Sequence, residues 1–356
     1  MDHRRELLAQ WLNKCLQSEL KLTNSSSSGF SLDVVSGDAS FRRYFRARIH
    51  DRSWIAVDAP PEKEDSHPFV AIARGWKAQG VNVPEVYAAD FEQGFMLLSD
   101  FGDRVMLSEL NDGSVNDYYL KALDELLKIQ QCDQVPGYDL PAYDEKKLVS
   151  EMALCPDWFF SQLLGMELSA HERQMLDLIF GILIESALDQ SRVVVHRDYH
   201  SRNLMITEDG SMGVLDFQDA VMGPISYDLV SLLRDCYISW PEARLQHWVE
   251  QYADRIFESG LITAEQRQRF RRAFDLMGMQ RHIKCVGIFS RLNLRDGKSG
   301  YLKDIPRTFA YIQQVSGQYR MFAEFSQWLE ERVIPAMNDC GYFGQIESFS
   351  SSGQLL

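Results

Sequence analysis

Three side chains suited to phosphoryl transfer follow apolar segments in the middle of the chain. Asp198 precedes Asn203 in the string H-R-D-Y-H-S-R-N, and Asp216 follows a later apolar run in L-D-F-Q-D. A carboxylate can accept the proton of a hydroxyl acceptor, while an amide and a carboxylate oxygen suit Mg²⁺ bound to nucleotide phosphates. The spacing H-x-D-x-x-x-x-N followed by Asp-Phe is typical of kinase-like catalysis. We predict Asp198 as the base and Asn203 and Asp216 as Mg²⁺ ligands.

The hydrophobic pattern indicates which elements position these residues. Residues 193–195 are three valines and predict a strand that ends at the catalytic loop. Residues 204–206 and 213–215 flank Glu-Asp-Gly and predict a hairpin. A second Asp-Phe-Gly string begins at Asp100, but it precedes the catalytic loop, so we expect Asp100 at the hinge between two lobes, beside the nucleotide.

The order of the remaining elements predicts an α+β fold with two kinase-like lobes. Residues 4–20 repeat leucines on one helical face, and the Ser-rich stretch 25–29 is a flexible link. Five strands with one helix at 69–79 then predict a small antiparallel sheet, and the pattern after residue 115 is mainly helical. The predicted divisions are 1–29 (helix and linker), 30–102 (nucleotide-binding lobe), 103–340 (catalytic and substrate lobe) and 341–356 (mobile tail).

Composition limits the classes of partner. The formal net charge is −14 and no basic tract occurs, which argues against binding to nucleic acid. Six cysteines without a C-x-x-C pair favour reduced thiols over disulfides or zinc. No leader and no apolar run of membrane-spanning length is visible. We expect a cytoplasmic protein that binds small molecules and no membrane; its oligomeric state is open.

The turn at 36–40 is the candidate phosphate-binding loop. Gly37 and Ser40 would allow close approach of the backbone to the nucleotide, and Arg43 and Arg46 would pair with its phosphates. A plain hairpin turn and a solvated strand face are equally compatible with these residues. Residues 54–60 contain no Lys, and 69–79 contain no Glu, so the usual ion pair of a kinase nucleotide lobe is absent. We hypothesise that Arg43 or Arg46 supplies this charge.

Several motifs resemble the aminoglycoside phosphotransferase family. The motifs are H-R-D-Y-H-S-R-N at 196–203, L-D-F-Q-D at 215–219 and Y-D-L at 227–229; longer strings around 215–237 and 280–308 resemble its bacterial amino-sugar kinases. The resemblance implies a protein-kinase-like fold, ATP and Mg²⁺ as cofactors, and Asp228 as a buried brace of the catalytic loop. It also implies phosphorylation of N-acetylmuramate and/or N-acetylglucosamine at the anomeric hydroxyl, in cell-wall recycling. We expect His196 to be architectural.

The acceptor is predicted to be small and anionic. Only eleven residues separate Asp216 from Asp228 and no A-P-E follows, which leaves no platform for a peptide. A run of basic residues between 281 and 298 would attract a carboxylate, although helix-surface charges would look the same. An aminoglycoside acceptor and a non-catalytic nucleotide-binding scaffold stay open as alternatives. The candidate substrate-binding residues are Asp219, Arg234, Asp235, Tyr237, Arg281 and Arg291.

Overall fold

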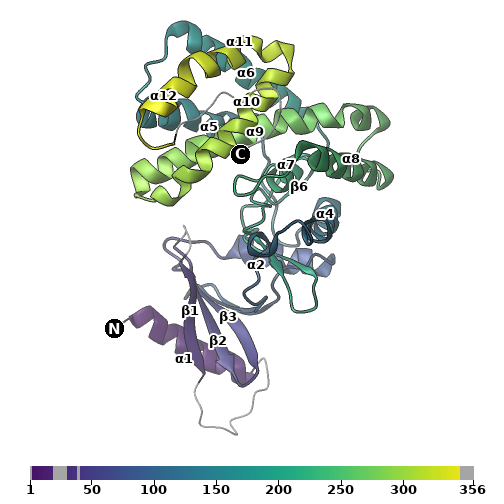
Figure 1. Ribbon diagram of the computed structural model, residues 1–356. Helices are drawn as coiled ribbons and strands as arrows, with labels where there is room; N and C mark the ends of the chain where they lie inside the picture. The colour runs from purple at the N-terminus through teal and green to yellow at the C-terminus, as the bar shows by residue number, and fades with distance from the viewer. Residues whose placement is uncertain (1, 19–29, 38–40, 345–356) are drawn as a thin grey trace. The chain divides into compact units, whose positions relative to one another are not determined.

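The computed structural model describes residues 2–18, 30–37 and 41–344 and divides into two compact units (Figure 1). Unit 1 contains Met1–Leu140 and Arg202–Ala220, and unit 2 contains Pro141–Ser201 and Val221–Leu356. The chain therefore passes between units inside the catalytic stretch, after Ser201. The predicted boundaries at 102 and 340 separate functional lobes and stay predictions. The linker 25–29 and residues 345–356 of the tail lie outside the described residues.

Unit 1 contains the antiparallel five-stranded sheet expected from the sequence. The strands lie in the order β1-β2-β3-β5-β4, and every neighbouring pair is antiparallel. Leucines spaced four residues apart place one face of α1 (His3–Ser18) on this sheet, where Leu8 and Leu12 are buried with Phe45 and Trp54 (Figure 1). The strands are β1 (Ser31–Gly37), β2 (Arg43–Ile49), β3 (Arg52–Asp58), β4 (Val86–Asp90) and β5 (Phe95–Ser99).

The rest of unit 1 holds the hairpin that carries the predicted metal ligands. Strands β7 (Leu204–Ile206) and β8 (Met212–Val214) pair as predicted, with Leu204 opposite Val214. The Phe217 ring just beyond β8 stacks on Phe69 of α2 (His67–Ala78) with ring centroids 4.8 Å apart. This contact anchors the end of the hairpin. The remaining helices of the unit are α3 (Met106–Glu109) and α4 (Val115–Gln131).

Unit 2 is mainly helical and is organised around the long helix α9 (Ala264–Asp296). A capping box of Thr263 and Gln266 begins α9, and Gly297 in the left-handed conformation ends it. Figure 1 shows α9 passing beside α10 (Ile305–Gln318). The other helices are α5 (Glu145–Met152), a π-helix (Cys155–Leu163), α6 (Ala170–Leu188), α7 (Tyr227–Leu233), α8 (Glu242–Glu258), α11 (Ala323–Trp328), a second π-helix (Leu329–Val333), α12 (Ile334–Asp339) and two 3₁₀ helices (Ser299–Asp304 and Arg320–Phe322).

A two-stranded ribbon in unit 2 leads to the catalytic loop. Strand β6 (Arg192–Val195) pairs antiparallel with β9 (Val221–Pro224), so that Val195 lies opposite Val221. Strand β9 has no signal in the sequence, because Gly223 and Pro224 are typical of a turn. Helix α7 ends at Leu233, and just beyond it the carboxylate of Asp235 accepts a hydrogen bond from Ser201 of the catalytic loop.

Close packing between α9 and the segment after α5 gives a test of this core. A Cβ atom added at Gly287 would lie 2.5 Å from the carbonyl carbon of Leu154 and 2.6 Å from the backbone nitrogen of Cys155. Because backbone atoms cannot move aside as a side chain can, Gly287→Ala should lower the free energy of unfolding by about 2 kcal/mol. Urea denaturation would measure this. The control is Gly181→Ala, which meets no atom within 4 Å; equal stability of the two variants would contradict the packing.

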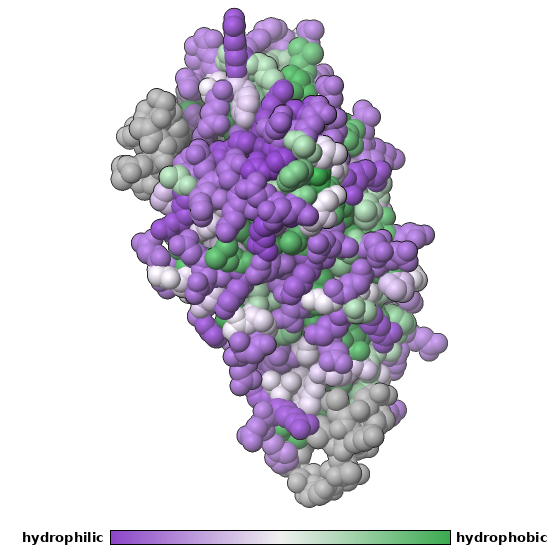
Figure 2. All heavy atoms as spheres, turned by 90° about the vertical axis from the view of Figure 1, so that its right-hand side faces the viewer, coloured by the Kyte–Doolittle hydropathy of each residue, from purple (hydrophilic) through white to green (hydrophobic). Residues whose placement is uncertain are grey.

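The visible surface in Figure 2 is mainly hydrophilic, and apolar side chains are present in small groups. This agrees with the acidic composition and its net charge of −14. Among the described helices, none combines the length and apolar character needed to cross a membrane.

Candidate active site

Asp228 braces the start of the catalytic loop. Its carboxylate accepts hydrogen bonds from the backbone N–H groups of His196 at 2.6 Å and Arg197 at 3.0 Å. Asp228 is fully buried, and burial raises its pKa to about 6 in spite of these bonds. The expectation of a buried brace is confirmed. His196 is also fully buried and accepts a bond from the Asp198 N–H through Nδ1, which confirms that it is architectural.

Arg197, directly before the predicted base, has an unusual backbone conformation. Its φ of 78° is left-handed, which costs a non-glycine residue about 1 kcal/mol or more. The guanidinium is held by Glu151 of α5 at 2.5 Å. Glu151 also accepts a hydrogen bond from the hydroxyl of Tyr143 and pairs with Lys284 of α9 at 3.2 Å. This buried carboxylate therefore fixes the turn that presents Asp198.

The electrostatic setting of Asp198 suits a base. Burial alone would raise the pKa of this carboxyl, but the positive charges of Lys284 and Arg197 and the nearby His200 outweigh burial. The net result is a lowered pKa, so the carboxylate is ionised at neutral pH. An ionised carboxylate is the form that can accept a hydroxyl proton.

The two predicted Mg²⁺ ligands lie together in unit 1. The amide nitrogen of Asn203 is 3.4 Å from a carboxylate oxygen of Asp216, and Gln218 donates to the other oxygen at 2.8 Å. The Leu215 N–H bonds to the Asn203 carbonyl at 2.9 Å, and Asp216 takes a left-handed φ of 61°. One amide and one carboxylate fit Mg²⁺, which keeps waters and phosphate oxygens as further ligands. Among the described residues no cluster of three His, Cys, Asp or Glu side chains could hold a metal.

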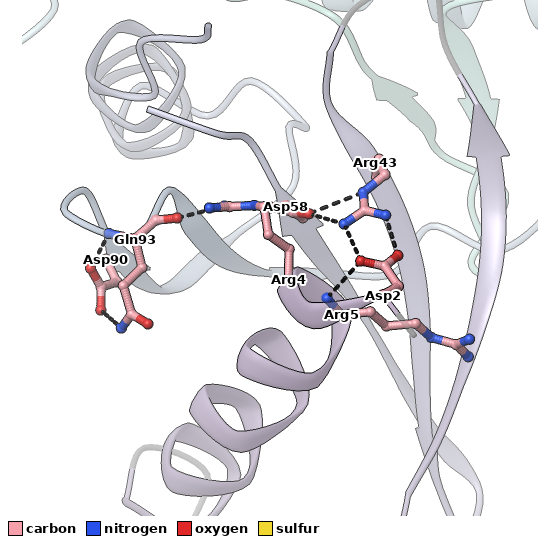
Figure 3. A network of polar contacts seen from close by, with 7 residues as sticks. All are labelled: Asp2, Arg4, Arg5, Arg43, Asp58, Asp90 and Gln93. Carbon is pink, nitrogen blue, oxygen red and sulfur yellow. Dashed lines mark hydrogen bonds and ion pairs between the residues drawn. The ribbon is translucent and has the colours of Figure 1, made fainter. Parts of the chain in front are cut away.

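Arg43 lies in a network of charges on unit 1 (Figure 3). Its guanidinium bonds to Asp58 of β3 and to Asp2, while Arg4 of α1 donates to Asp58 at 2.8 Å and to the Gln93 carbonyl at 2.7 Å. Asp58 is fully buried, so it needs these cations. Two carboxylates neutralise Arg43 here, and its predicted contact with phosphates stays a prediction.

The other predicted nucleotide-binding residues lie near the ends of strands. Arg46 is buried and pairs with Asp100 at 2.6 Å and Asp103 at 2.7 Å, so Asp100 holds a strand arginine in place after β5. The backbone of Gly37 pairs with Arg43, while Ser40 lies outside the described residues. A nucleotide contact of any of these residues stays a prediction.

The predicted substrate residues occupy different environments. Arg234 is fully buried and pairs with Asp275 at 2.6 Å, as an internal support. Asp235 bonds to the Ser201 N–H at 3.0 Å and to the Tyr237 N–H at 2.9 Å, which ties this segment to the catalytic loop. Asp219 is exposed and belongs to unit 1.

The basic residues predicted to attract an anionic acceptor are divided between the interior and the surface of unit 2. Arg281, His282 and Lys284 are at most 6 % exposed, and Arg291 is half-buried. The exposed Arg295 pairs with the adjacent Asp296 at 2.7 Å. Two of these cations, Arg281 and Lys284, therefore lie inside unit 2 and act on Asp198. Lys284 belongs to the basic run noted in the sequence, but its contact with Glu151 could not be predicted, and Glu151 had no signal because it occurs within an ordinary amphipathic helix pattern.

The fold and sequence match known phosphotransferases. A family model described as a phosphotransferase enzyme family matches residues 31–270. The N-acetylmuramate/N-acetylglucosamine kinase of Pseudomonas aeruginosa is 43 % identical over 330 residues, which cover 92 % of this chain and 96 % of the relative. The protein of that name from Neisseria meningitidis serogroup B is 40 % identical, with 89 % and 97 % covered.

A solved structure supports the kinase-like fold. Plasmodium vivax ethanolamine kinase is 11 % identical to the chain and aligns with a TM-score of 0.59, covering 88 % of this chain and 89 % of its own. The predicted α+β fold, with an antiparallel sheet at the N-terminal end and a mainly helical remainder, is confirmed.

Proposed function

The chain belongs to the phosphotransferase enzyme family, and from that membership we propose that it is an ATP-dependent amino-sugar kinase. Its acceptors are N-acetylmuramate and N-acetylglucosamine, phosphorylated at the anomeric hydroxyl. One observation carries the proposal. Asp198, Asn203 and Asp216 follow one another in the order that phosphoryl transfer needs, in a chain whose near-full-length relatives bear this kinase name.

The residues divide the work of the transfer. Asp198, kept ionised by the cations around it, accepts the proton as the sugar hydroxyl attacks phosphorus in line with the leaving oxygen. Asn203 and Asp216 would hold Mg²⁺, which neutralises charge on the nucleotide phosphates when bound. Asp228 and Glu151 fix the loop around Asp198. Little covalent chemistry is required of the protein beyond this positioning.

We propose that Arg43 pairs with the nucleotide phosphates in place of the absent lysine. Its side chain is 40 % exposed and shares Asp58 with Arg4, so a phosphate can replace the exposed Asp2. Arg46 is 7 % exposed and enclosed by two carboxylates, which makes exchange costly. Gly37, Ser40 and Asp100 complete the proposed nucleotide-binding residues.

A transfer assay with a sugar panel tests this function. Incubation with ATP and Mg²⁺ should convert N-acetylmuramate and N-acetylglucosamine to products that have lost their reducing-end reactivity, because phosphorylation at the anomeric hydroxyl blocks ring opening. A 6-phosphate product would retain that reactivity and would contradict the proposed position. Transfer to a kanamycin-type acceptor with none to either amino sugar would overturn the proposed substrate class.

A further inference from the structure

Arg281 is a buried guanidinium without a close carboxylate. It is 3 % exposed, and among the described residues no Asp or Glu lies within ion-pair distance of it. Its Nη1 donates to the sulfur of Cys236 at 3.6 Å, while Nε is buried without a hydrogen-bond partner. A buried cation with so few partners is costly unless an anion joins it. Arg281 is therefore a buried positive charge without an ion pair among the described residues, although the chain as a whole carries a net charge of −14.

Arg307 of α10 converges on the same residue. Its Nη1 donates to the carbonyl oxygen of Cys236 at 3.1 Å, so the two arginines contact opposite ends of one cysteine. Its nearest carboxylate, Asp304, is 4.0 Å away. The Arg307 side chain is 34 % exposed, which leaves donors of its guanidinium accessible from solvent. Arg307 can therefore contact a ligand directly, while Arg281 adds positive charge from the interior of unit 2.

The segment between these arginines is joined to the catalytic loop. Asp235 holds Ser201, and the Tyr237 ring lies edge-on to His200 with centroids 5.2 Å apart. The Tyr237 ring also contacts Phe289 at a centroid distance of 6.5 Å. Tyr301 stacks on Phe289 at 5.5 Å, so that an aromatic row extends from the catalytic loop. Half-buried tyrosines of this kind offer an apolar face for a sugar ring and a polar edge for its hydroxyl groups.

We propose that Arg307 and Arg281 form a carboxylate-binding subsite beside the catalytic loop, which favours an acceptor that carries a carboxylate. This inference rests on the proposed function. Of the two sugars, N-acetylmuramate carries a lactyl carboxylate and N-acetylglucosamine is neutral. A planar guanidinium binds a carboxylate through paired, charge-assisted hydrogen bonds. The subsite should therefore raise the affinity for N-acetylmuramate and leave the affinity for N-acetylglucosamine unchanged.

The test is Arg307→Gln, compared with wild type on both sugars. Affinity for N-acetylmuramate, measured by titration calorimetry in the presence of a non-hydrolysable nucleotide, should fall on the order of 10-fold. Affinity for N-acetylglucosamine should stay within about 2-fold, because the lost hydrogen bonds have no counterpart in that sugar. The ratio of kcat/KM for the two sugars should change in parallel. Arg307→Lys keeps the positive charge but lacks the paired N–H donors of a guanidinium. Its affinity for N-acetylmuramate should therefore lie between those of wild type and Arg307→Gln.

The matched control is Arg320→Gln, an exposed arginine just beyond α10 that should leave both affinities unchanged. Equal losses for both sugars would mean that Arg307 only supports the 235–237 backbone, and no loss for either sugar would remove Arg307 from the site; either result overturns the subsite. The binding assay does not require turnover. One result separates the two proposals. If Arg307→Gln weakens binding of N-acetylmuramate as stated but wild type transfers no phosphate, the proposed function is overturned and the subsite is supported.

Discussion

Asp198→Asn is expected to lower kcat for sugar phosphorylation by about 10²–10⁴-fold. The amide has nearly the size of the carboxylate, but it cannot accept the proton of the attacking hydroxyl. Binding of nucleotide and sugar should change little, because the substitution removes no group that the acceptor needs in the ground state. Steady-state kinetics gives kcat, and calorimetry with a non-hydrolysable nucleotide gives the two affinities.

The same change at an exposed carboxyl is the control. Asp189 lies at the end of α6 with its side chain 71 % exposed, and Asp189→Asn should leave kcat unchanged. A kcat for Asp198→Asn within 3-fold of wild type would exclude Asp198 as the base. If wild type and variant were equally inactive while both bound nucleotide, a nucleotide-binding scaffold would be the better description of the protein.

Asp228→Ala should lower the free energy of unfolding by about 2–4 kcal/mol and reduce kcat as well. The substitution leaves the buried N–H groups of His196 and Arg197 without an acceptor, and these groups begin the loop that presents Asp198. Asp228→Asn keeps one acceptor oxygen, so it should lose less stability. Urea unfolding of the three proteins gives the free energies. Equal stability of wild type and Asp228→Ala would contradict the brace.

The raised pKa of Asp228 also sets the sign of a pH dependence. The carboxyl titrates near pH 6 in the folded state, above its value of about 3.9 in an unfolded chain. The folded state therefore prefers the protonated form, and this contribution is lost as pH rises from about 4 to above 6. The stability of wild type relative to Asp228→Asn should fall over this interval by up to about 3 kcal/mol. A relative stability that rises with pH would be the contrary result.

Local patterns in the sequence predicted much of the structure. Strand β5 and the hairpin of β7 and β8 occur where apolar runs flank turn residues, and the cores of the other strands except β9 and of α1 agree with the periodicity. The order of Asp198, Asn203 and Asp216 predicted the chemistry, because that signal depends on spacing alone. Asn203 and Asp216 meet since the hairpin register places Leu204 opposite Val214.

Contacts between distant segments could not be predicted in the same way. The pairing of Arg43 with Asp58 depends on strand register, and nothing local distinguishes a phosphate-binding arginine from one that balances a buried carboxylate. Glu151 and Lys284 are far apart in sequence and meet only because α5 and α9 pack together. For the basic residues of α9, the sequence left a ligand-binding cluster and helix-surface charges equally open, because composition does not tell which face of a long helix is buried.

The left-handed backbone at Arg197 and Asp216 has a consequence for protein engineering. Among the described residues, these two and His50 are the non-glycine positions with positive φ. At Arg197 the strain is offset by the buried ion pair with Glu151, so Arg197→Gly would remove more stabilisation than it restores. Asp216→Gly would relieve strain and at the same time remove a proposed metal ligand. Thermostabilisation of this chain therefore requires a catalytic counter-screen at position 216.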